Sequence, residues 1–145
     1  MSSCALLGQE FFNYIGFKER IKEVIEEQIK NGVTEFYNLF AIRFDFLCAH
    51  IVSDLREKYP HIKNILALQY IPTEGFVIPR EFDKCVLLSS RKTLDSYAIL
   101  YTNIKLVEMV DCVVSGVFRN NGESKIACDY AEKLGKPIIY FMKNI

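Results

Sequence analysis

The sequence has no surplus of charge of either sign. In a chain of 145 residues, 18 Lys and Arg balance 18 Asp and Glu, so the net charge is zero. Proteins that hold nucleic acid through its phosphates usually carry a basic surplus or a cluster of Lys and Arg, and this sequence has neither. We therefore expect no nucleic-acid partner.

Long apolar runs are also missing. No 18 apolar residues follow one another, so the sequence offers no candidate for a membrane-spanning helix. The first residues, MSSCALLGQEFF, have no basic leader, and their apolar run is too short for a secretory signal. We expect no membrane partner and a cytoplasmic location.

The cysteines form no Cys-x-x-Cys pair, and their number is odd. They are Cys4, Cys48, Cys85, Cys112 and Cys128. Scattered cysteines of this kind are typical of reduced, buried thiols. Cys48 and His50 are the only close pair of metal-binding residue types, and on a helix they would point about 200° apart. We predict neither a metal site nor a cofactor.

The composition indicates a folded chain that forms one domain over residues 1–145. Half of the residues are hydrophobic and 13% are aromatic, which excludes a disordered protein. The length is that of one ordinary domain, and no internal repeat, low-complexity tract or interdomain linker interrupts it.

The last third of the chain contains the clearest unit. Residues 112–118 are apolar and β-branched, as in a strand buried on both faces, and residues 138–141 predict a second strand. Between them, a polar turn at 119–124 precedes apolar residues at helical spacing, with Asn121 or Ser124 as the expected helix cap. Ligands of parallel sheets bind where strands end and helices begin, so this turn is a candidate site. Its single glycine makes a poor phosphate loop, and an ordinary turn is the simpler interpretation.

The preceding segments alternate between the two periodicities. Strands are expected at 4–7, 33–39, within 62–71 and at 84–88; helices at 17–31, from Asp45 as N-cap to the residue before Tyr59, and at 97–110; loops at 9–16, 73–83 and 89–95. This alternation predicts an α/β protein: a three-layer sandwich with a mostly parallel sheet of five or six strands and helices on both faces.

Several short stretches follow one another in a recognisable order and spacing, although none is decisive alone. They are 4–8, Phe36-Tyr37, Phe44-Asp45, 55–62, 97–99 with Asn103, Asp111, Gly122-Glu123-Ser124, Tyr130-Ala131 and 136–139. Nearly end to end, this order resembles the SLOG superfamily of Rossmann-like domains, named after the Smf/DprA and LOG proteins. Within it, the chain is similar to the small YpsA-like proteins of unknown function.

The resemblance implies a ligand groove at the carboxyl ends of the strands that accepts a nucleotide or a nucleotide-derived molecule. The residues expected to line it are Gly8, Gln9, Arg43, Asp45, Asn103, Arg119, Asn121, Gly122 and Ser124. Arg43 and Arg119 are the cations best placed to meet an anion, and Asp45 would accept a ribose hydroxyl. Plain surface positions for both arginines and for Asn103, and a capping role for Asp45, are the simpler alternatives.

The sequence departs from the family pattern at the positions that contact phosphates. Gln9 and Glu10 replace a His-Arg pair, residues 39–43 replace a loop with two glycines, Thr102 replaces an Arg and Glu123 replaces a glycine. Because glycine lets a ligand approach the backbone closely, the bulky residues of 39–43 should block a phosphate there.

Catalysis is not expected. LOG-type phosphoribohydrolases carry Pro-Gly-Gly-x-Gly-Thr-x-x-Glu, and aligning Ser124 with that Thr puts Ala127 at the position of the catalytic Glu. The alternative is an N-glycosidase acting on nucleoside monophosphates through Glu10, Asp45 or Glu123. No sequence feature pairs these three carboxylates as a general acid and base.

A third alternative is a scaffold that has lost its ligand and forms a homo-oligomer. The loop at 39–42 is apolar, and such residues at the end of a strand must be covered. The cover would be a second subunit or the loop at 73–83 of the same chain.

Overall fold

The computed structural model of the chain describes residues 2–88 and 96–142. The loop expected at 89–95 lies outside the described residues. The strands in this part are β1 (Ser2–Leu7), β2 (Val33–Asn38), β3 (Lys63–Leu68), β4 (Lys84–Leu87), β5 (Cys112–Ser115) and β6 (Ile138–Tyr140). The helices are α1 (Lys18–Lys30), α2 (Arg43–Lys58), α3 (Ser96–Met109) and α4 (Glu123–Lys133), with a short 3₁₀ helix, η1 (Tyr14–Phe17), before α1.

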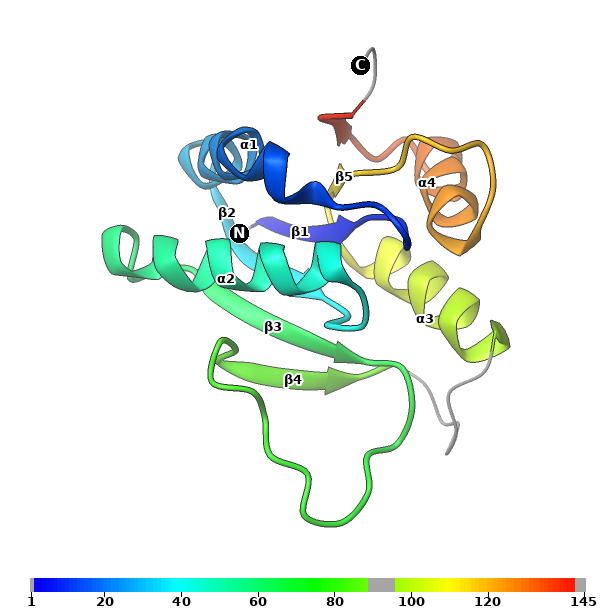
Figure 1. Cartoon of the computed structure of the whole chain (residues 1–145), viewed down its shortest axis with the longest axis horizontal. Helices are drawn as coiled ribbons and strands as arrows, with labels where there is room; N and C mark the ends of the chain where they lie inside the picture. Colours follow the sequence, from blue (N-terminus) through cyan, green and yellow to red (C-terminus); the bar gives the residue numbers. More distant parts are fainter. Residues whose placement is uncertain (1, 89–95, 143–145) are drawn as a thin grey trace.

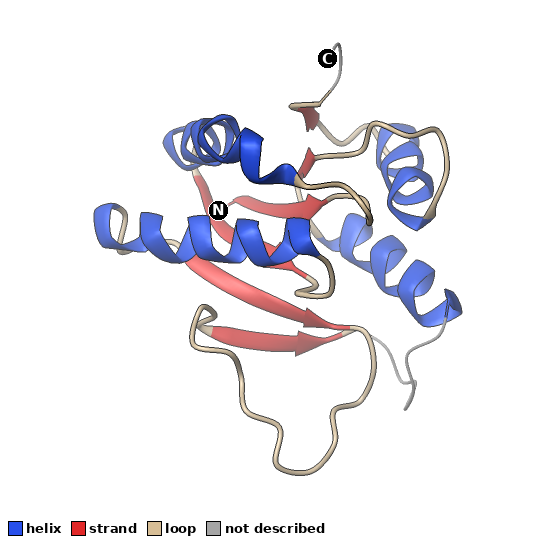
Figure 2. Cartoon of the chain, in the orientation of Figure 1, coloured by secondary structure: helices blue, strands red, loops and turns tan. Residues whose placement is uncertain are grey.

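The strands form one parallel sheet in the order β4-β3-β2-β1-β5-β6. The chain moves outward from β1 to β4 and then returns to the other side of β1 with β5. Helices α1 and α2 cover one face and α3 and α4 the other (Figures 1 and 2). The predicted three-layer α/β sandwich with a Rossmann-like parallel sheet is therefore confirmed.

The central strand β1 shows why this sequence makes three layers. Successive side chains of a strand point to opposite faces. Cys4 and Leu6 accordingly pack under α1 and α2, while Ala5 and Leu7 pack under α3 and α4. All four are almost fully buried, as the continuous apolar run predicts for a strand covered on both sides.

Helix α1 confirms the helix predicted at 17–31, with its apolar side chains on one buried stripe. Ile21, Val24, Ile25 and Ile29 are buried, and Gly32, with φ of 104°, follows the helix end. The predicted strand at 112–118 is shorter than expected because β5 ends at Ser115. The Ser115 hydroxyl accepts a hydrogen bond from the N–H of Val117 and turns the chain out of the sheet.

The predicted helix caps are wrong at two positions. Asp45 is the third residue of α2 and not its N-cap, which is Ile42. Helix α4 starts after Gly122, whose φ of 95° suits glycine, and among the described residues no side chain caps this start, so neither Asn121 nor Ser124 has the expected role.

The cysteines confirm the interpretation of reduced thiols: all five are free, and only Cys85 is partly exposed.

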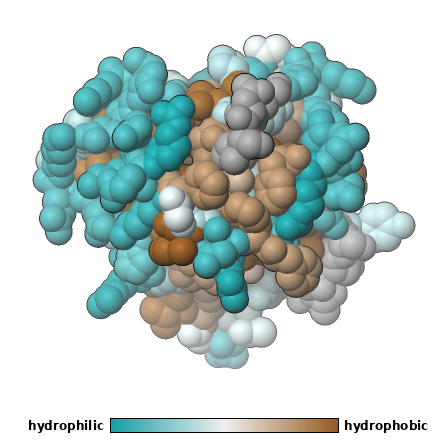
Figure 3. Space-filling view, turned by 45° about the horizontal axis from the view of Figure 1, so that its top comes forward, coloured by the Kyte–Doolittle hydropathy of each residue, from teal (hydrophilic) through white to brown (hydrophobic). Residues whose placement is uncertain are grey.

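None of the helices within 2–88 and 96–142 has the length and apolar character needed to cross a membrane. In the same residues, no three His, Cys, Asp or Glu side chains cluster as metal ligands would. Figure 3 shows apolar surface between two hydrophilic flanks on the side of the molecule that carries the edge strand β6, whose residues are half-buried.

Candidate ligand pocket

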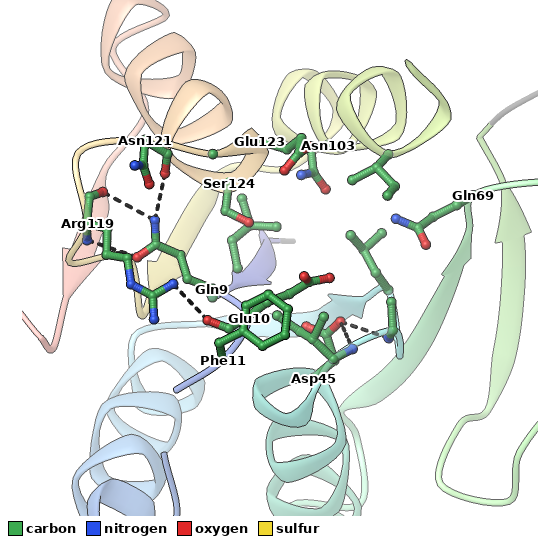
Figure 4. A pocket seen from close by; sticks show the side chains of 17 residues that line it. Gln9, Glu10, Phe11, Asp45, Gln69, Asn103, Arg119, Asn121, Glu123 and Ser124 are labelled. Atoms are coloured by element: carbon green, nitrogen blue, oxygen red, sulfur yellow. Dashed lines mark hydrogen bonds between the residues drawn. The ribbon is translucent and has the colours of Figure 1, made fainter. Parts of the chain in front are cut away.

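A pocket of about 380 Å³ lies at the carboxyl ends of the strands (Figure 4). It is lined by residues 7–11 after β1, Leu39, Ala41 and Ile42 after β2, Gln69 after β3, Asp45 of α2, Ile99 and Asn103 of α3, Arg119, and residues 121–124 at the start of α4. From β1 the chain adds strands β2 to β4 on one side and then β5 and β6 on the other, so the strand order reverses between β1 and β5. Open α/β sheets bind ligands outside the strand ends at such a switch point.

Eight of the nine residues proposed from the sequence line this pocket, and all nine lie in the described part of the chain. The eight are Gly8, Gln9, Asp45, Asn103, Arg119, Asn121, Gly122 and Ser124. Arg43 is exposed at the start of α2 and is not among the lining residues. Their role in binding a ligand stays a prediction.

Sequence reasoning missed Phe11, Gln69 and Ile99, which also line the pocket. Phe11 and Gln69 each follow the end of a strand, and that position was the available signal. Ile99 carried no signal, since its spacing equals that of the core residues of α3.

The side chain of Gln9 connects the loop after β1 to the loop before α4 through hydrogen bonds. Its Nε2 donates hydrogen bonds to the carbonyl oxygens of Arg119 (3.2 Å) and Asn121 (2.9 Å). Its Oε1 accepts from the N–H groups of Phe118 (3.0 Å) and Arg119 (2.9 Å). Both ends of the amide are thus occupied within the protein, and Gln9 positions the loop before α4 instead of offering its side chain to a ligand (Figure 4).

Arg119 lies at the edge of the pocket and is held there by its own contacts. Its guanidinium donates to the carbonyl oxygen of Glu10 at 2.8 Å and lies over the ring of Phe118, 4.8 Å from the ring centre. The expected cation is therefore present, but its orientation is fixed by the protein.

The floor of the pocket explains Gly8. A Cβ added to Gly8 would lie 2.3 Å from Cγ of Phe44, a ring that is fully buried. The Phe44 ring packs against Tyr14 and Phe141, with ring centres 4.8 and 5.9 Å away. The Tyr14 hydroxyl accepts from the N–H of Gln9 and donates to the carbonyl of Gly116. Glycine is required at position 8 by the packing of Phe44.

The loop after β2 is filled by its own side chains, although the pocket beside it is open. The N–H of Phe40 donates to Oδ1 of Asn38 (2.6 Å), and the N–H groups of Ala41 and Ile42 donate to Oδ2 of Asp45 (2.9 and 3.2 Å). Side-chain bulk was the predicted reason for a block against a phosphate here. The stronger reason is that these three N–H donors are already occupied.

The Phe40 ring is covered within the same chain. It packs against Phe46 and Phe82, with ring centres 4.8 and 5.2 Å away. Phe82 belongs to the loop at 73–83, so the alternative in which this loop covers Phe40 is the one observed. A homo-oligomer stays a prediction that this ring does not require.

Asp45 is a buried carboxyl group, only 3% exposed. Burial raises its pKa to about 7, and the charge of Glu10 contributes, while the hydrogen bonds from Ala41 and Ile42 act in the opposite direction. No feature of the sequence indicated this burial. The raised pKa of Asp45 thus lies near neutral pH.

Asn103 projects from α3 into the pocket (Figure 4). Its side chain is 1% exposed, and its Oδ1 has no hydrogen-bond partner among the described residues. The alternative of a solvated face residue is therefore wrong. A buried acceptor left without a partner costs about 1–3 kcal/mol, so the pocket holds an acceptor that a ligand could satisfy.

The position of the LOG-type catalytic Glu is structural here. Ala127 is fully buried in α4 among the core residues beneath the sheet. Among the described residues that line the pocket, the carboxyl groups are those of Glu10, Asp45 and Glu123, and the guanidinium is that of Arg119. The lining thus has three carboxyl groups and one guanidinium, so it is acidic on balance even when Asp45 is neutral.

The fold places the chain with Rossmann-like α/β proteins. No family model matches the sequence, and no curated protein matches it significantly. Solved structures similar in fold are DNA processing protein A from Helicobacter pylori (TM-score 0.68, 16% identity) and DNA processing protein A, DprA, from Streptococcus pneumoniae (0.70, 11%). Another is the molybdenum cofactor carrier protein from Chlamydomonas reinhardtii (0.59, 12%).

These matches cover 94%, 95% and 94% of this chain and 63%, 49% and 74% of the respective proteins. The chain therefore spans about half to two thirds of the two DprA proteins. The Helicobacter pylori protein binds single-stranded DNA. At these identities the likeness shows a shared fold alone. The resemblance to Smf/DprA domains is confirmed at that level, and the YpsA-like subgroup stays a prediction.

Proposed function

We propose that this chain forms a SLOG-like binding domain over residues 1–145, and that it holds a small nucleotide-derived ligand in the pocket without catalysing a reaction. The observation that carries the proposal is the Oδ1 of Asn103, a buried acceptor without a described partner that lines a pocket at the switch point of the sheet. Buried polar groups in folded proteins are normally paired, and a ligand would supply the missing donor.

The pocket has the features of a small-molecule site. Its volume of about 380 Å³ lies within the range of roughly 300–1,000 Å³ of known ligand pockets. Apolar walls from Leu39, Ile42 and Ile99 surround a few polar groups, as in most such sites.

Single-stranded DNA is the partner of one structural neighbour, so it belongs in the test. The zero net charge of the chain and the carboxyl groups of the pocket favour a small ligand over a polyanion.

Isothermal titration calorimetry and thermal melting test the proposal. The ligands are nucleosides, their phosphates, cyclic nucleotides, ADP-ribose and a single-stranded oligonucleotide. We expect saturable heat and a raised Tm for a small ligand. Asn103→Leu should weaken binding at least tenfold, whereas Asn31→Leu, an exposed position after α1, should leave it unchanged. Absence of heat and of a Tm shift with every small compound would refute the proposal.

One observation favours a second candidate, an N-glycosidase. Asp45 is buried in the pocket with a pKa raised to about 7, and carboxyl groups with such values often act as general acids or bases. Chromatographic detection of free base after incubation with AMP, CMP and GMP decides between the two. Release that is lost in Asp45→Asn and kept in Glu123→Gln would replace the binding proposal with this one.

A further inference from the structure

The first step concerns the backbone amides that an anion would need. Around the pocket, the N–H groups of Phe40, Ala41 and Ile42 donate to Asn38 and Asp45. The N–H groups of Phe118 and Arg119 donate to Oε1 of Gln9. In both loops a side-chain oxygen of the protein occupies the place that a phosphate oxygen takes in phosphate-binding loops.

The second step concerns charge. The guanidinium of Arg119 is held by the carbonyl of Glu10, and the side chains of Glu10 and Glu123 add negative charge to the lining. The start of α4 has no described side-chain cap, but Glu123 in its first turn carries the charge that an anionic ligand would bring. Each phosphate on a ligand would therefore meet the negative charge of Glu10 and Glu123, which opposes the attraction of the uncapped N–H groups at the start of α4.

The third step concerns the acceptors of the pocket. Oδ1 of Asn103 lacks a described partner, and the side chains of Glu10 and Glu123 reach the same space. Figure 4 shows Asn103 and Glu123 on one side of the pocket and Phe11 and Asp45 on the other. Such a lining suits a ligand that donates N–H or O–H groups.

The fourth step concerns Phe11. Its ring lines the pocket and is 94% exposed, and its backbone has a φ of 59°, a conformation rare for bulky residues. The preceding residues are fixed, since Gln9 is bound through its N–H and both ends of its amide, and the carbonyl of Glu10 is bound by Arg119. The protein therefore places an unburied aromatic ring on a restrained backbone at the pocket edge, where a flat ligand can stack on it.

We infer that the pocket selects an uncharged, planar ligand bearing N–H donors, of the nucleobase or nucleoside class, and disfavours its phosphorylated forms. Phe11 stacks on the ring of the ligand, and Oδ1 of Asn103 accepts a hydrogen bond from it. This inference rests on the proposed function and names the part of the nucleotide-derived ligand that is recognised.

The test compares four nucleosides with their 5′-mono-, di- and triphosphates by calorimetry at constant ionic strength. We expect at least one nucleoside to bind, and its triphosphate to bind at least tenfold more weakly. The double variant Glu10→Gln/Glu123→Gln should reduce that difference severalfold, because it removes two of the negative charges.

The stacking residue is tested with Phe11→Gly, since glycine adopts the positive φ without strain and the fold is retained. Stacking on an aromatic side chain is worth roughly 1–3 kcal/mol per base, so nucleoside binding should weaken about tenfold or more. Phe11→Tyr keeps an aromatic ring and should retain nucleoside binding. Phe76→Ala, a partly exposed ring in the loop at 73–83 that does not line the pocket, should leave it unchanged.

The outcomes separate the two claims. A triphosphate or ADP-ribose that binds more tightly than the nucleoside, with loss in Arg119→Gln, overturns the inference and leaves the proposed function standing. Nucleoside binding that is indifferent to Phe11→Gly also overturns the inference alone. Binding of no small compound, or of a single-stranded oligonucleotide only, overturns both.

Discussion

Two regions beside the loop after β1 are built in opposite ways. The floor is the buried packing of Phe44 and Tyr14 against Gly8, and the rim is the pair Phe11 and Asn103, which line the pocket. In the floor, the buried ring of Phe44 fills the space above Gly8, and the Tyr14 hydroxyl both accepts and donates a hydrogen bond. At the rim, the ring of Phe11 is exposed and Oδ1 of Asn103 has no described partner. Satisfied groups stabilise the fold, and the proposed ligand would pair the unsatisfied one, so substitutions in the two regions should separate stability from binding.

Among single substitutions in the floor, the largest effect is expected for Gly8→Ala. The new Cβ would lie 2.3 Å from Cγ of Phe44, and the buried ring cannot move without displacing Tyr14 and Phe141. We expect a loss of about 3 kcal/mol in the free energy of unfolding, measured by urea denaturation. Gly16→Ala, where no atom lies within 4 Å of the added Cβ, is the control. Equal stabilities of the two variants would contradict the assignment of Gly8 to the floor.

Tyr14→Phe tests the hydrogen bonds of the floor. It removes the hydroxyl that pairs the N–H of Gln9 and the carbonyl of Gly116, and it leaves both without that partner. The expected loss is about 2 kcal/mol by the same measurement. Tyr130→Phe removes an exposed hydroxyl bond to Glu108 and should cost less than about 0.5 kcal/mol. The comparison fails if the exposed hydroxyl matters as much as the buried one.

Asp45 joins floor and rim, and its titration makes stability depend on pH. Its pKa is raised from 3.8 to about 7 on folding, so the folded state binds the extra proton between these values. Its contribution is therefore full below the lower value and is lost as pH rises through the upper one, with a slope of up to about 1.4 kcal/mol per pH unit.

Asp45→Asn should remove this slope in urea melts recorded across that pH range. The charge of Glu10 raises the pKa of Asp45, and Asp45 in turn interacts electrostatically with Tyr14 and Cys48. Glu10→Gln is therefore the second variant, and it should shift the pH range of the slope to lower pH. An unchanged slope in Asp45→Asn would show that other groups produce it.

The smallest effect is expected at the rim. Phe11→Gly relieves a positive φ and should raise the free energy of unfolding by up to about 1 kcal/mol, in contrast to every substitution in the floor. Thermal and urea melts measure it, with Phe76→Ala as the reference for removing a partly exposed ring. A clear loss of stability would mean that Phe11 belongs to the floor.

Much of the fold could be predicted from the sequence because its signals are local. The stripe from Ile21 to Ile29 and the apolar run before Gly8 define a helix and a strand by spacing alone. The parallel order then brings the strand ends together at one edge, which explains why most of the proposed site residues line one pocket.

The rest depends on contacts between distant segments. Nothing near Gln9 in the sequence indicates that its amide binds the loop before α4, and nothing near Phe40 indicates that its ring packs on Phe82. Asp45 was predicted as an N-cap because its residue type favours that position. The path of the loop after β2 places it three residues later, where its carboxylate reaches back to Ile42.

The bonds made by Gln9 have a consequence for any rearrangement of the chain. They join the loop after β1 to a loop 109 to 112 residues further along. Deleting β1, or relocating it by circular permutation with a flexible linker, would release the segment that leads into α4. A change near β1 would thus loosen a wall of the cavity that lies more than a hundred residues further along the sequence.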